Sequence, residues 1–369
     1  MDINNKRILI IKQSSLGDII HTLPVAHALK RCSPSCTIGW IVQEGYTSLL
    51  AGDPAVDVIH PIRIPSTSDP NGHWSDYGKA LTATARQLRQ LRAFFQKAPY
   101  DLILDLHASF RSGLFALMNP GGQRIGCADA KEFNSLFQHH LLHRSTTSVH
   151  AVDGNLLFSD FLGCRAQTED FYLCTSRADE EQADRFLHEA GIDARTPFVY
   201  MNPLARWASK CWLASRWSTL CDQLMEAGIP PILAGGPSDQ PYLNAIAGRM
   251  NRPAVIAAGH LNLTGSVALM KRASVYVGVD TGPMHMAAMV GIPVVALFGP
   301  THPEKVGPYR VQSTVVRDEG LDCLCCRKRT CDHMRCMENI SVATVLEAIL
   351  VHISNQCQQQ GYDQRCESV

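Results

Sequence analysis

The segment from residue 275 to residue 300 constrains the fold of this chain most. Residues 275–279 are apolar and rich in β-branched side chains, which is typical of a strand buried inside a parallel sheet. A polar turn at 280–283 interrupts the strand, a helix is expected over 284–290 and a second buried strand over 292–298. The turn therefore lies at the carboxyl end of a strand and the amino end of a helix. Open α/β sheets bind ligands at that edge, and helix amino termini favour phosphate groups.

Strands and helices alternate along most of the remaining sequence in two separate series. The first series begins with an apolar strand at 7–11, and the second begins at 197–201. Such alternation is typical of parallel sheets joined by right-handed crossovers. We therefore predict an α/β fold with two Rossmann-like, doubly wound parallel-sheet domains that face each other across a cleft. The predicted domains are 1–175 and 176–345, followed by a carboxyl-terminal helix and tail over 346–369.

Composition restricts the classes of partner. The chain has 369 residues, 34 basic and 34 acidic side chains and a net charge of zero, so no general basic field favours nucleic acid. No apolar run reaches the roughly 18 residues that a transmembrane helix needs, and the amino terminus lacks the pattern of a secretory signal. We expect a cytoplasmic protein without a transmembrane segment, and leave open a peripheral contact with the inner face of the cytoplasmic membrane. In that compartment the 14 cysteines are expected to be reduced, and most of them to be buried.

Two common nucleotide-binding motifs are missing from both series. Neither G-x-G-x-x-G nor G-x-x-x-x-G-K-[ST] occurs, which disfavours a dinucleotide dehydrogenase and a P-loop NTPase. Four other segments occur in order, at 12–24, 205–217, 280–285 and 297–309. On these segments the chain resembles the heptosyltransferases of glycosyltransferase family 9, which transfer heptose from ADP-heptose to the lipopolysaccharide core. The resemblance implies a GT-B fold that binds the acceptor on its amino-terminal domain and the donor on its carboxyl-terminal domain.

Asp18 lies just after the first strand, at a predicted helix start. A carboxylate at this position is often a helix cap, and spacing alone makes that interpretation as good as a catalytic one. The family resemblance implies that Asp18 is the general base, because glycosyl transfer needs a group that takes the proton from the acceptor hydroxyl. Ser15 is expected to shape the turn before it. His21, one helical turn further on, is expected to line the site or to be structural.

Lys210 lies beyond the first strand of the second series, between Trp207 and Trp212. A lone lysine at such a place is commonly a solvated surface residue. The resemblance implies instead that Lys210 binds the phosphates of the donor, because the departing diphosphate needs a cation.

The polar turn at 280–283 supplies the other expected donor contacts. Thr281 and Gly282 can offer hydroxyl and backbone N–H groups to a phosphate, assisted by the helix dipole. His285 follows on the same side of the first helical turn, and a lone histidine in an apolar helix is usually a core residue. The resemblance favours donor binding by His285 and a contact between Asp280 and a sugar hydroxyl.

Asp239 ends a Gly-Gly-Pro-Ser-Asp turn between a strand and a helix. The glycines would let a nucleotide approach the backbone, and the carboxylate could accept a hydrogen bond from a ribose hydroxyl, as acidic residues do in other nucleotide-binding folds. A helix cap is at least as good an interpretation of Asp239.

Several polar residues of the amino-terminal domain are candidates for binding an anionic acceptor, for which phosphate or carboxylate groups of the lipopolysaccharide inner core would be suitable. Ordinary surface polarity explains them equally well. The candidates are Lys12, Ser15, Arg63, His107 and Arg111, with the loop around His73.

Four cysteines near the carboxyl terminus follow a C-x₂-C-x₄-C-x₄-C spacing: Cys323, Cys326, Cys331 and Cys336. This spacing could ligate zinc or an iron–sulfur cluster. We prefer structural packing or a labile disulfide, and predict neither a metal nor a cofactor.

The sequence is therefore interpreted as an inverting glycosyltransferase that moves heptose from ADP-heptose to the lipid A–core acceptor at the inner-membrane surface. In the mechanism that the resemblance implies, the acceptor oxygen attacks the anomeric carbon from the face opposite the diphosphate. Two alternatives remain: a nucleotide-sugar epimerase of the same architecture, and a non-catalytic nucleotide-sugar-binding protein.

Overall fold

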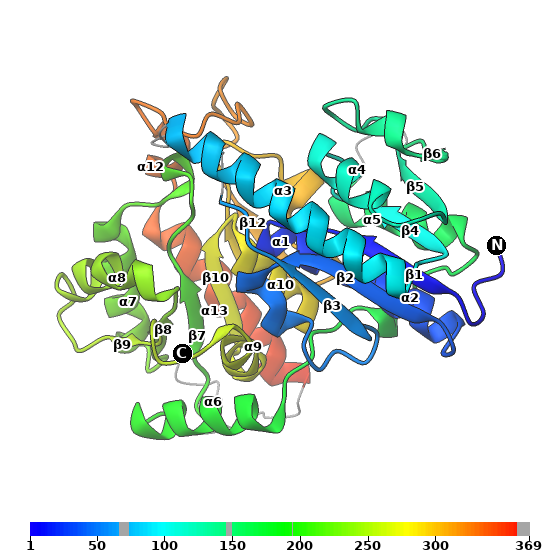
Figure 1. Ribbon diagram of the computed structural model, residues 1–369. Helices are drawn as coiled ribbons and strands as arrows, with labels where there is room; N and C mark the ends of the chain where they lie inside the picture. The colour runs from blue at the N-terminus through cyan, green and yellow to red at the C-terminus, as the bar shows by residue number, and fades with distance from the viewer. Residues whose placement is uncertain (66–73, 145–149, 194, 360–369) are drawn as a thin grey trace. The chain divides into compact units, whose positions relative to one another are not determined.

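A computed structural model describes residues 1–65, 74–144, 150–193 and 195–359 (Figure 1). The chain divides into two compact units, one from Met1 to Phe171 and one that begins at Tyr172. The loop predicted around His73 lies outside the described residues. Among the described residues, no helix combines the length and apolarity needed to cross a membrane.

The first unit is built on a six-stranded parallel sheet with the order β3-β2-β1-β4-β5-β6. This order, with the first strand in the middle, is that of a doubly wound Rossmann-like sheet. Its strands are β1 (Arg7–Ile11), β2 (Thr37–Gln43), β3 (Val58–Ile62), β4 (Leu102–Asp105), β5 (Gln123–Cys127) and β6 (His140–Leu142). Its α-helices are α1 (Leu16–Ile20), α2 (Leu23–Cys32), α3 (Trp74–Lys97), α4 (Phe110–Leu117) and α5 (Ala151–Phe161). Short 3₁₀ helices are η1 (Glu44–Leu49), η2 (Asn134–Phe137) and η3 (Thr168–Asp170).

Alternation of side chains along β1 explains why this sheet carries helices on both faces. Leu9 and Ile11 pack with Phe95 of α3 and Phe115 of α4 in one core cluster. The helices α2 and α5 pack against each other instead, and Ile8 and Ile10 are also fully buried. Both faces of the sheet are therefore covered, as parallel sheets require.

The second unit repeats this arrangement, with the strand order β12-β11-β10-β7-β8-β9. Its strands are β7 (Val199–Asn202), β8 (Pro231–Leu233), β9 (Val255–Ile256), β10 (Val275–Val279), β11 (Val294–Leu297) and β12 (Ser313–Val316). Its α-helices are α6 (Arg177–Glu189), α7 (Ala214–Glu226), α8 (Gln240–Ala247), α9 (Leu263–Arg272), α10 (Gly282–Val290), α11 (Pro303–Val306), α12 (Arg335–Glu338) and α13 (Val342–Gln359). Its 3₁₀ helices are η4 (Ala208–Lys210) and η5 (Pro237–Asp239). The two doubly wound parallel sheets confirm the predicted fold class.

The core of the second unit joins the sheet to the carboxyl-terminal helix. Trp212 and Trp217 are buried, and their rings meet edge to face at 5.0 Å. Val345 and Ile349 of α13 belong to the same cluster, which also contains Val277 of β10. The last helix is therefore part of the core of this unit.

The segment that constrained the prediction folds largely as expected. β10 and α10 are joined by the turn that contains Asp280, and Gly291 ends the helix in the left-handed conformation at φ 84°. Glycine adopts that conformation without the steric cost that a β-carbon brings. The two outer strands β6 and β12 were not predicted, because each is short and has a single buried residue.

Candidate functional site

The first group of candidate residues lies at the carboxyl end of β1. Ser15 precedes α1, and both its N–H and its hydroxyl donate to Oδ2 of Asp18, at 2.8 and 2.7 Å. The ammonium of Lys12 lies 3.5 Å from Oδ1 and donates to the carbonyl of Leu106 at 2.8 Å. The Asp18 side chain is 48% exposed, so a substrate hydroxyl can reach it. The carboxylate both stabilises the first turn of α1 and faces solvent, and the two interpretations of Asp18 are compatible.

Neighbouring groups keep Asp18 ionised. Desolvation acts to raise the pKa of Asp18, but the Lys12 ammonium and the two Ser15 bonds lower it below its usual value. A carboxylate accepting charge-assisted hydrogen bonds beside a cation is stabilised in its charged form. Asp18 is therefore ready to accept a proton at neutral pH, although a low pKa also makes it a weaker base.

Asp105 is a buried residue of the same site that sequence reasoning missed. Its carboxylate accepts from the backbone N–H of His107 and Ala108, at 3.2 and 3.0 Å, and from the side chains of Ser112 and Asn134, at 2.9 and 2.7 Å. Burial raises the pKa of Asp105 despite these bonds. Ala108 adopts a left-handed φ of 56°, which is uncommon for a residue with a β-carbon. The carboxylate thus holds the turn that carries His107. A polar Asp at the end of an apolar strand was the available sequence clue.

His107 follows β4, the neighbour of β1 in the sheet. Burial lowers the pKa of His107 to about 4, with a further contribution from the Lys12 charge, so the imidazole is neutral at pH 7. Arg111 of α4 is half-buried and close enough to influence the same histidine. The structure therefore gathers Lys12, Asp18, His107 and Arg111 around the carboxyl ends of two adjacent strands.

Two other candidate residues make contacts of their own outside this group. Arg63 follows β3, which β2 separates from β1, and its exposed guanidinium pairs with Glu44. His21 is buried, and its ring meets that of His150 edge to face at 5.5 Å. The burial of His21 agrees with its structural interpretation.

The second group lies in the other unit, at the carboxyl ends of the adjacent strands β7 and β10. Lys210 donates to Oδ2 of Asp280 at 2.6 Å and to the Asp280 carbonyl at 3.1 Å. Its ammonium also lies 4.6 Å from the ring centroid of Trp207. The side chains of the pair are 15% and 6% exposed, and His285 Nε2 is 4.0 Å from Oδ1 of Asp280. Three predicted donor residues therefore form one buried cluster.

The amino end of α10 adjoins this cluster. Thr281 is the N-cap residue of α10, but its side chain makes no capping bond to the helix. Gly282 begins the helix, and both residues are only partly buried. A helix amino terminus has backbone N–H groups without partners inside the helix and a partial positive charge. Thr281 and Gly282 are thus arranged to receive an anionic group.

Asp239 ends η5, beyond the carboxyl end of β8, which is the other neighbour of β7. Its carboxylate accepts from the N–H of Gly236 at 2.8 Å. It occupies the N-cap position of α8 but makes no side-chain cap bond to that helix. Because parallel strands end at one edge of a sheet, Asp239 shares this edge with Lys210 and Asp280.

The cysteine-rich segment packs against η4, the 3₁₀ helix that carries Lys210. Ser209 donates to the carbonyls of Lys328 and Arg329, at 2.6 and 3.3 Å, and the Arg329 guanidinium lies 5.5 Å from the ring centroid of Trp207. Cys323, Cys326, Cys331 and Cys336 are free thiols, and no group of three or more His, Cys, Asp or Glu side chains in the described residues is arranged to hold a metal ion. Burial, followed by the charges of the other three thiols, raises the pKa of Cys336. A β-carbon on Gly299 would lie 2.7 Å from the sulfur of Cys336. The sulfur of Cys336 therefore packs closely against the backbone of Gly299, and its role is to fill the core.

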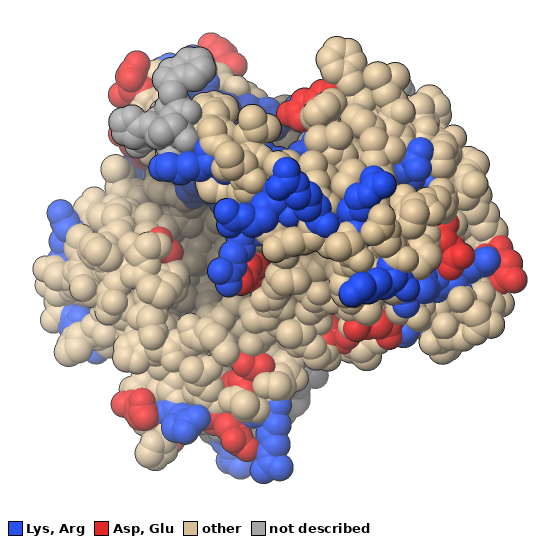
Figure 2. Space-filling model, viewed as in Figure 1, with Lys and Arg blue, Asp and Glu red and all other residues tan. Residues whose placement is uncertain are grey.

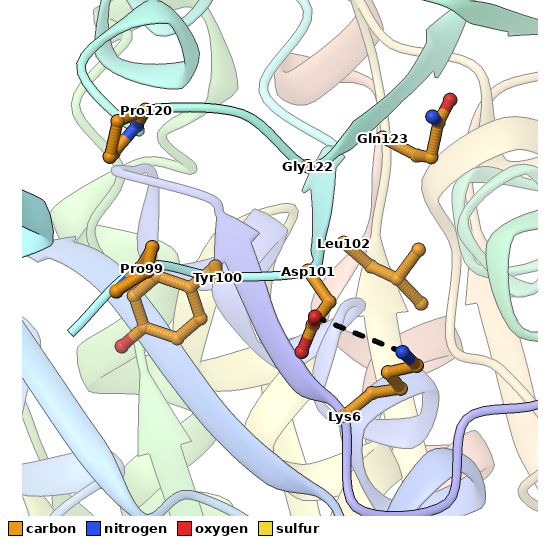
Figure 3. Close-up of a pocket in the computed structure, with 8 residues that line it drawn as sticks. All are labelled: Lys6, Pro99, Tyr100, Asp101, Leu102, Pro120, Gly122 and Gln123. Carbon is orange, nitrogen blue, oxygen red and sulfur yellow. Dashed lines mark ion pairs between the residues drawn. The ribbon is translucent and has the colours of Figure 1, made fainter.

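A pocket of about 430 Å³ lies at the opposite, amino-terminal edge of the first sheet (Figure 3). Lys6 and Asp101 line it and lie 3.9 Å apart. None of the predicted site residues lines this pocket, so we do not assign the substrate site to it.

Comparison with known proteins identifies the family. The model of glycosyltransferase family 9 (heptosyltransferase) matches residues 87–336. The chain belongs to glycosyltransferase family 9. It is therefore a glycosyltransferase, and the matched segment contains the Lys210–Asp280 cluster and His107.

Named relatives of this family 9 enzyme cover nearly its whole length. Lipopolysaccharide heptosyltransferase 1 of Pseudomonas aeruginosa is 28% identical, over 89% of this chain and 88% of the relative. Lipopolysaccharide heptosyltransferase 1 of Escherichia coli K12 is 26% identical, over 84% and 93%.

Solved structures confirm the fold of the family 9 enzyme. A glycosyl transferase family 9 protein from Veillonella parvula has a TM-score of 0.79 at 22% identity, covering 96% of this chain and 99% of that chain. The E. coli heptosyltransferase WaaC with ADP has a TM-score of 0.71 at 24% identity, covering 94% and 99%. At these identities the similarity concerns the fold.

Proposed function

We propose that this enzyme is an inverting heptosyltransferase that moves heptose from ADP-heptose to the inner core of lipopolysaccharide, with Asp18 as the general base. The observation that carries the proposal is the Asp18 carboxylate, which is ionised, solvent-accessible and held by Ser15 and Lys12 in a family 9 chain. The names of the curated relatives support the sugar and the acceptor.

In the proposed reaction, Asp18 takes the proton of the acceptor hydroxyl as its oxygen attacks the anomeric carbon. A bond forms between that oxygen and carbon while the bond from the carbon to the diphosphate oxygen breaks. ADP leaves with the electron pair, and the configuration at the anomeric carbon inverts. His107 is neutral at pH 7, so it leaves the charge balance around Asp18 unchanged.

Lys210 and the amino end of α10 are the proposed binding groups for the departing diphosphate. An ammonium has three N–H donors, and two of those of Lys210 point to Asp280. The third can donate to a phosphate oxygen, while Asp280 keeps the ammonium in place. Preorganised donors of this kind stabilise charge that develops in the transition state. We assign no cofactor, because groups of the chain itself meet the charge of the diphosphate.

The residues near Asp18 are the proposed acceptor contacts. Lys12 and Arg111 would attract phosphate or carboxylate groups of a lipid A–core acceptor, and His107 would donate to or accept from its hydroxyls. We do not include Arg63 in this contact set, because Glu44 pairs with it two strands away from β1. Since the acceptor carries a lipid, we infer that the enzyme works in the cytoplasm at the inner face of the membrane.

A transfer assay tests this proposal. The protein is incubated with ADP-heptose and a series of truncated lipopolysaccharide acceptors, and the products are measured by mass spectrometry. We expect one acceptor to gain the mass of a single heptose. An epimer formed from the donor alone would favour the epimerase, and donor binding without transfer to any acceptor would favour the non-catalytic protein.

A further inference from the structure

The outer face of α3 in the first unit carries a dense row of cations. From residue 77 to residue 97 the sequence contains no acidic residue. It contains five basic residues, all of them exposed: Lys79, Arg86, Arg89, Arg92 and Lys97. Figure 2 shows Lys and Arg side chains gathered along the surface over this helix. The net charge of the chain is zero, so its overall composition does not explain why five basic residues gather on one helix.

Helical geometry places these cations on one side. An α-helix turns by about 100° per residue, so Arg86, Arg89 and Arg92 together cover about a third of its circumference. By the same geometry, Lys79 and Lys97 project in nearly the same direction as Arg86. Leu91 and Phe95 on the opposite side are buried in the core of the unit. The basic face is therefore turned away from the core of the first unit.

The same helix also exposes large apolar side chains. Leu81 is 72% exposed, and Tyr77 and Phe94 are exposed as well. Leu81 lies at the edge of the basic face. Some arginines elsewhere on the surface pair with acids, as Arg177 does with Glu181 at 2.8 Å. Among the described side chains of α3, none is acidic, and Arg86, Arg89 and Arg92 form no ion pair with any described residue, so this face is positive.

We propose that the basic face of α3 docks the protein onto an anionic bilayer through the phosphate groups of lipid headgroups. A helix that lies along a membrane surface combines Lys and Arg side chains with exposed Leu and aromatic residues. Headgroup phosphates attract each nearby cation, and arginine binds phosphate in a bidentate manner. The exposed apolar residues favour a bilayer over a nucleic acid. The inference does not depend on the proposed reaction, because lipid binding needs no donor and no catalysis.

Vesicle sedimentation tests the proposal. The full chain is mixed with vesicles of phosphatidylethanolamine and phosphatidylglycerol, or with neutral phosphatidylcholine vesicles, at low salt and at high salt. We expect binding to the anionic vesicles only, with loss at high salt because screening weakens exposed charges. The triple variant Arg86→Gln, Arg89→Gln, Arg92→Gln should bind on the order of 100-fold more weakly, at about fivefold for each cation.

A matched control removes three exposed arginines from the second unit. Arg185→Gln, Arg249→Gln and Arg252→Gln change the net charge by the same amount but leave α3 intact, and this variant should bind like the original protein. Thermal unfolding checks that both variants fold, and transfer to a short soluble acceptor should be unchanged in both. Equal loss of binding in the two variants would overturn the proposal. So would failure of the original protein to bind anionic vesicles, or α3-dependent binding to RNA in preference to lipid.

Discussion

Replacing Lys210 with methionine separates its role in the fold from its role with the donor. Methionine keeps most of the apolar stem beside Trp207 but removes the cation 2.6 Å from Asp280. Asp280 is then left as a buried carboxylate without that cation. Breaking a buried pair in this way typically costs 3–5 kcal/mol, and we expect about 3 kcal/mol because Lys210 retains some exposure to water.

The companion variants complete a double-mutant cycle. Asp280→Asn preserves the bond from Lys210 to the main-chain carbonyl and should cost about 1–2 kcal/mol. The double variant removes both charges and should also cost about 1–2 kcal/mol, which corresponds to a coupling of about 3 kcal/mol. Donor affinity should behave differently. Loss of a charge-assisted bond to phosphate lowers ADP affinity about 30-fold, in the double variant as well as in Lys210→Met.

Urea unfolding followed by tryptophan fluorescence measures the free energy of unfolding of each variant, from which the coupling is calculated. Trp207, Trp212 and Trp217 all lie in the second unit, and the transitions of the two units are fitted separately because a two-unit chain need not unfold in one step. Isothermal titration with ADP measures the affinity. A coupling below about 0.5 kcal/mol would refute the description of a buried, mutually dependent pair. Full ADP affinity in the double variant would refute the phosphate role of Lys210.

Three further predictions concern burial and pH. Burial lowers the pKa of His60 to about 4, so the unfolded chain takes up a proton between pH 6.5 and about 4 that the folded chain does not. The free energy of unfolding should therefore fall by up to about 3 kcal/mol as the pH falls through that window. His60→Gln should remove this part of the pH dependence, measured by unfolding at a series of acidic pH values. Trp212→Phe should destabilise the protein by about 1–2 kcal/mol more than Trp217→Phe, as measured by urea unfolding. The reason is that Trp212 Nε1 donates to a main-chain carbonyl at 3.1 Å, whereas Trp217 Nε1 has no acceptor among the described residues. The rate constant kcat/KM for transfer should show no acid limb near pH 6.5, because the pKa of His107 is about 4 and the pKa of Asp18 is lowered below its usual value by Lys12 and Ser15. A limb near pH 6.5 that disappears in His107→Asn would contradict this.

Local patterns predicted the strands and turns that carry the site. The apolar runs that became β1 and β10 were recognisable from their composition, and so were the polar turns after them. Position at a strand end made Asp18, Lys210 and Asp280 candidates, because loops at that edge of parallel strands converge. Their roles came from the family resemblance, because position alone explained Asp18 equally well as a helix cap and Lys210 as a surface residue.

Side-chain partnerships could not be predicted in the same way. Lys210 meets Asp280 only because β7 and β10 are neighbours, although two strands separate them along the chain. Asp105 was overlooked because its partners come from η2 and α4 as well as from the turn after β4. The pairing of Arg63 with Glu44 likewise depends on strand order. Such contacts follow from the topology of the sheet, which a single sequence does not state.

The most direct test of the proposed mechanism is heptose transfer by Asp18→Asn. Asparagine has nearly the same shape and can still accept hydrogen bonds from Ser15, so α1 should keep its structure. It cannot take the proton of the acceptor hydroxyl. The rate of transfer from ADP-heptose, measured by product mass, should fall on the order of 10²–10⁴-fold, while donor affinity stays near that of the original protein. Turnover close to the original rate would contradict the assignment of Asp18 as the general base.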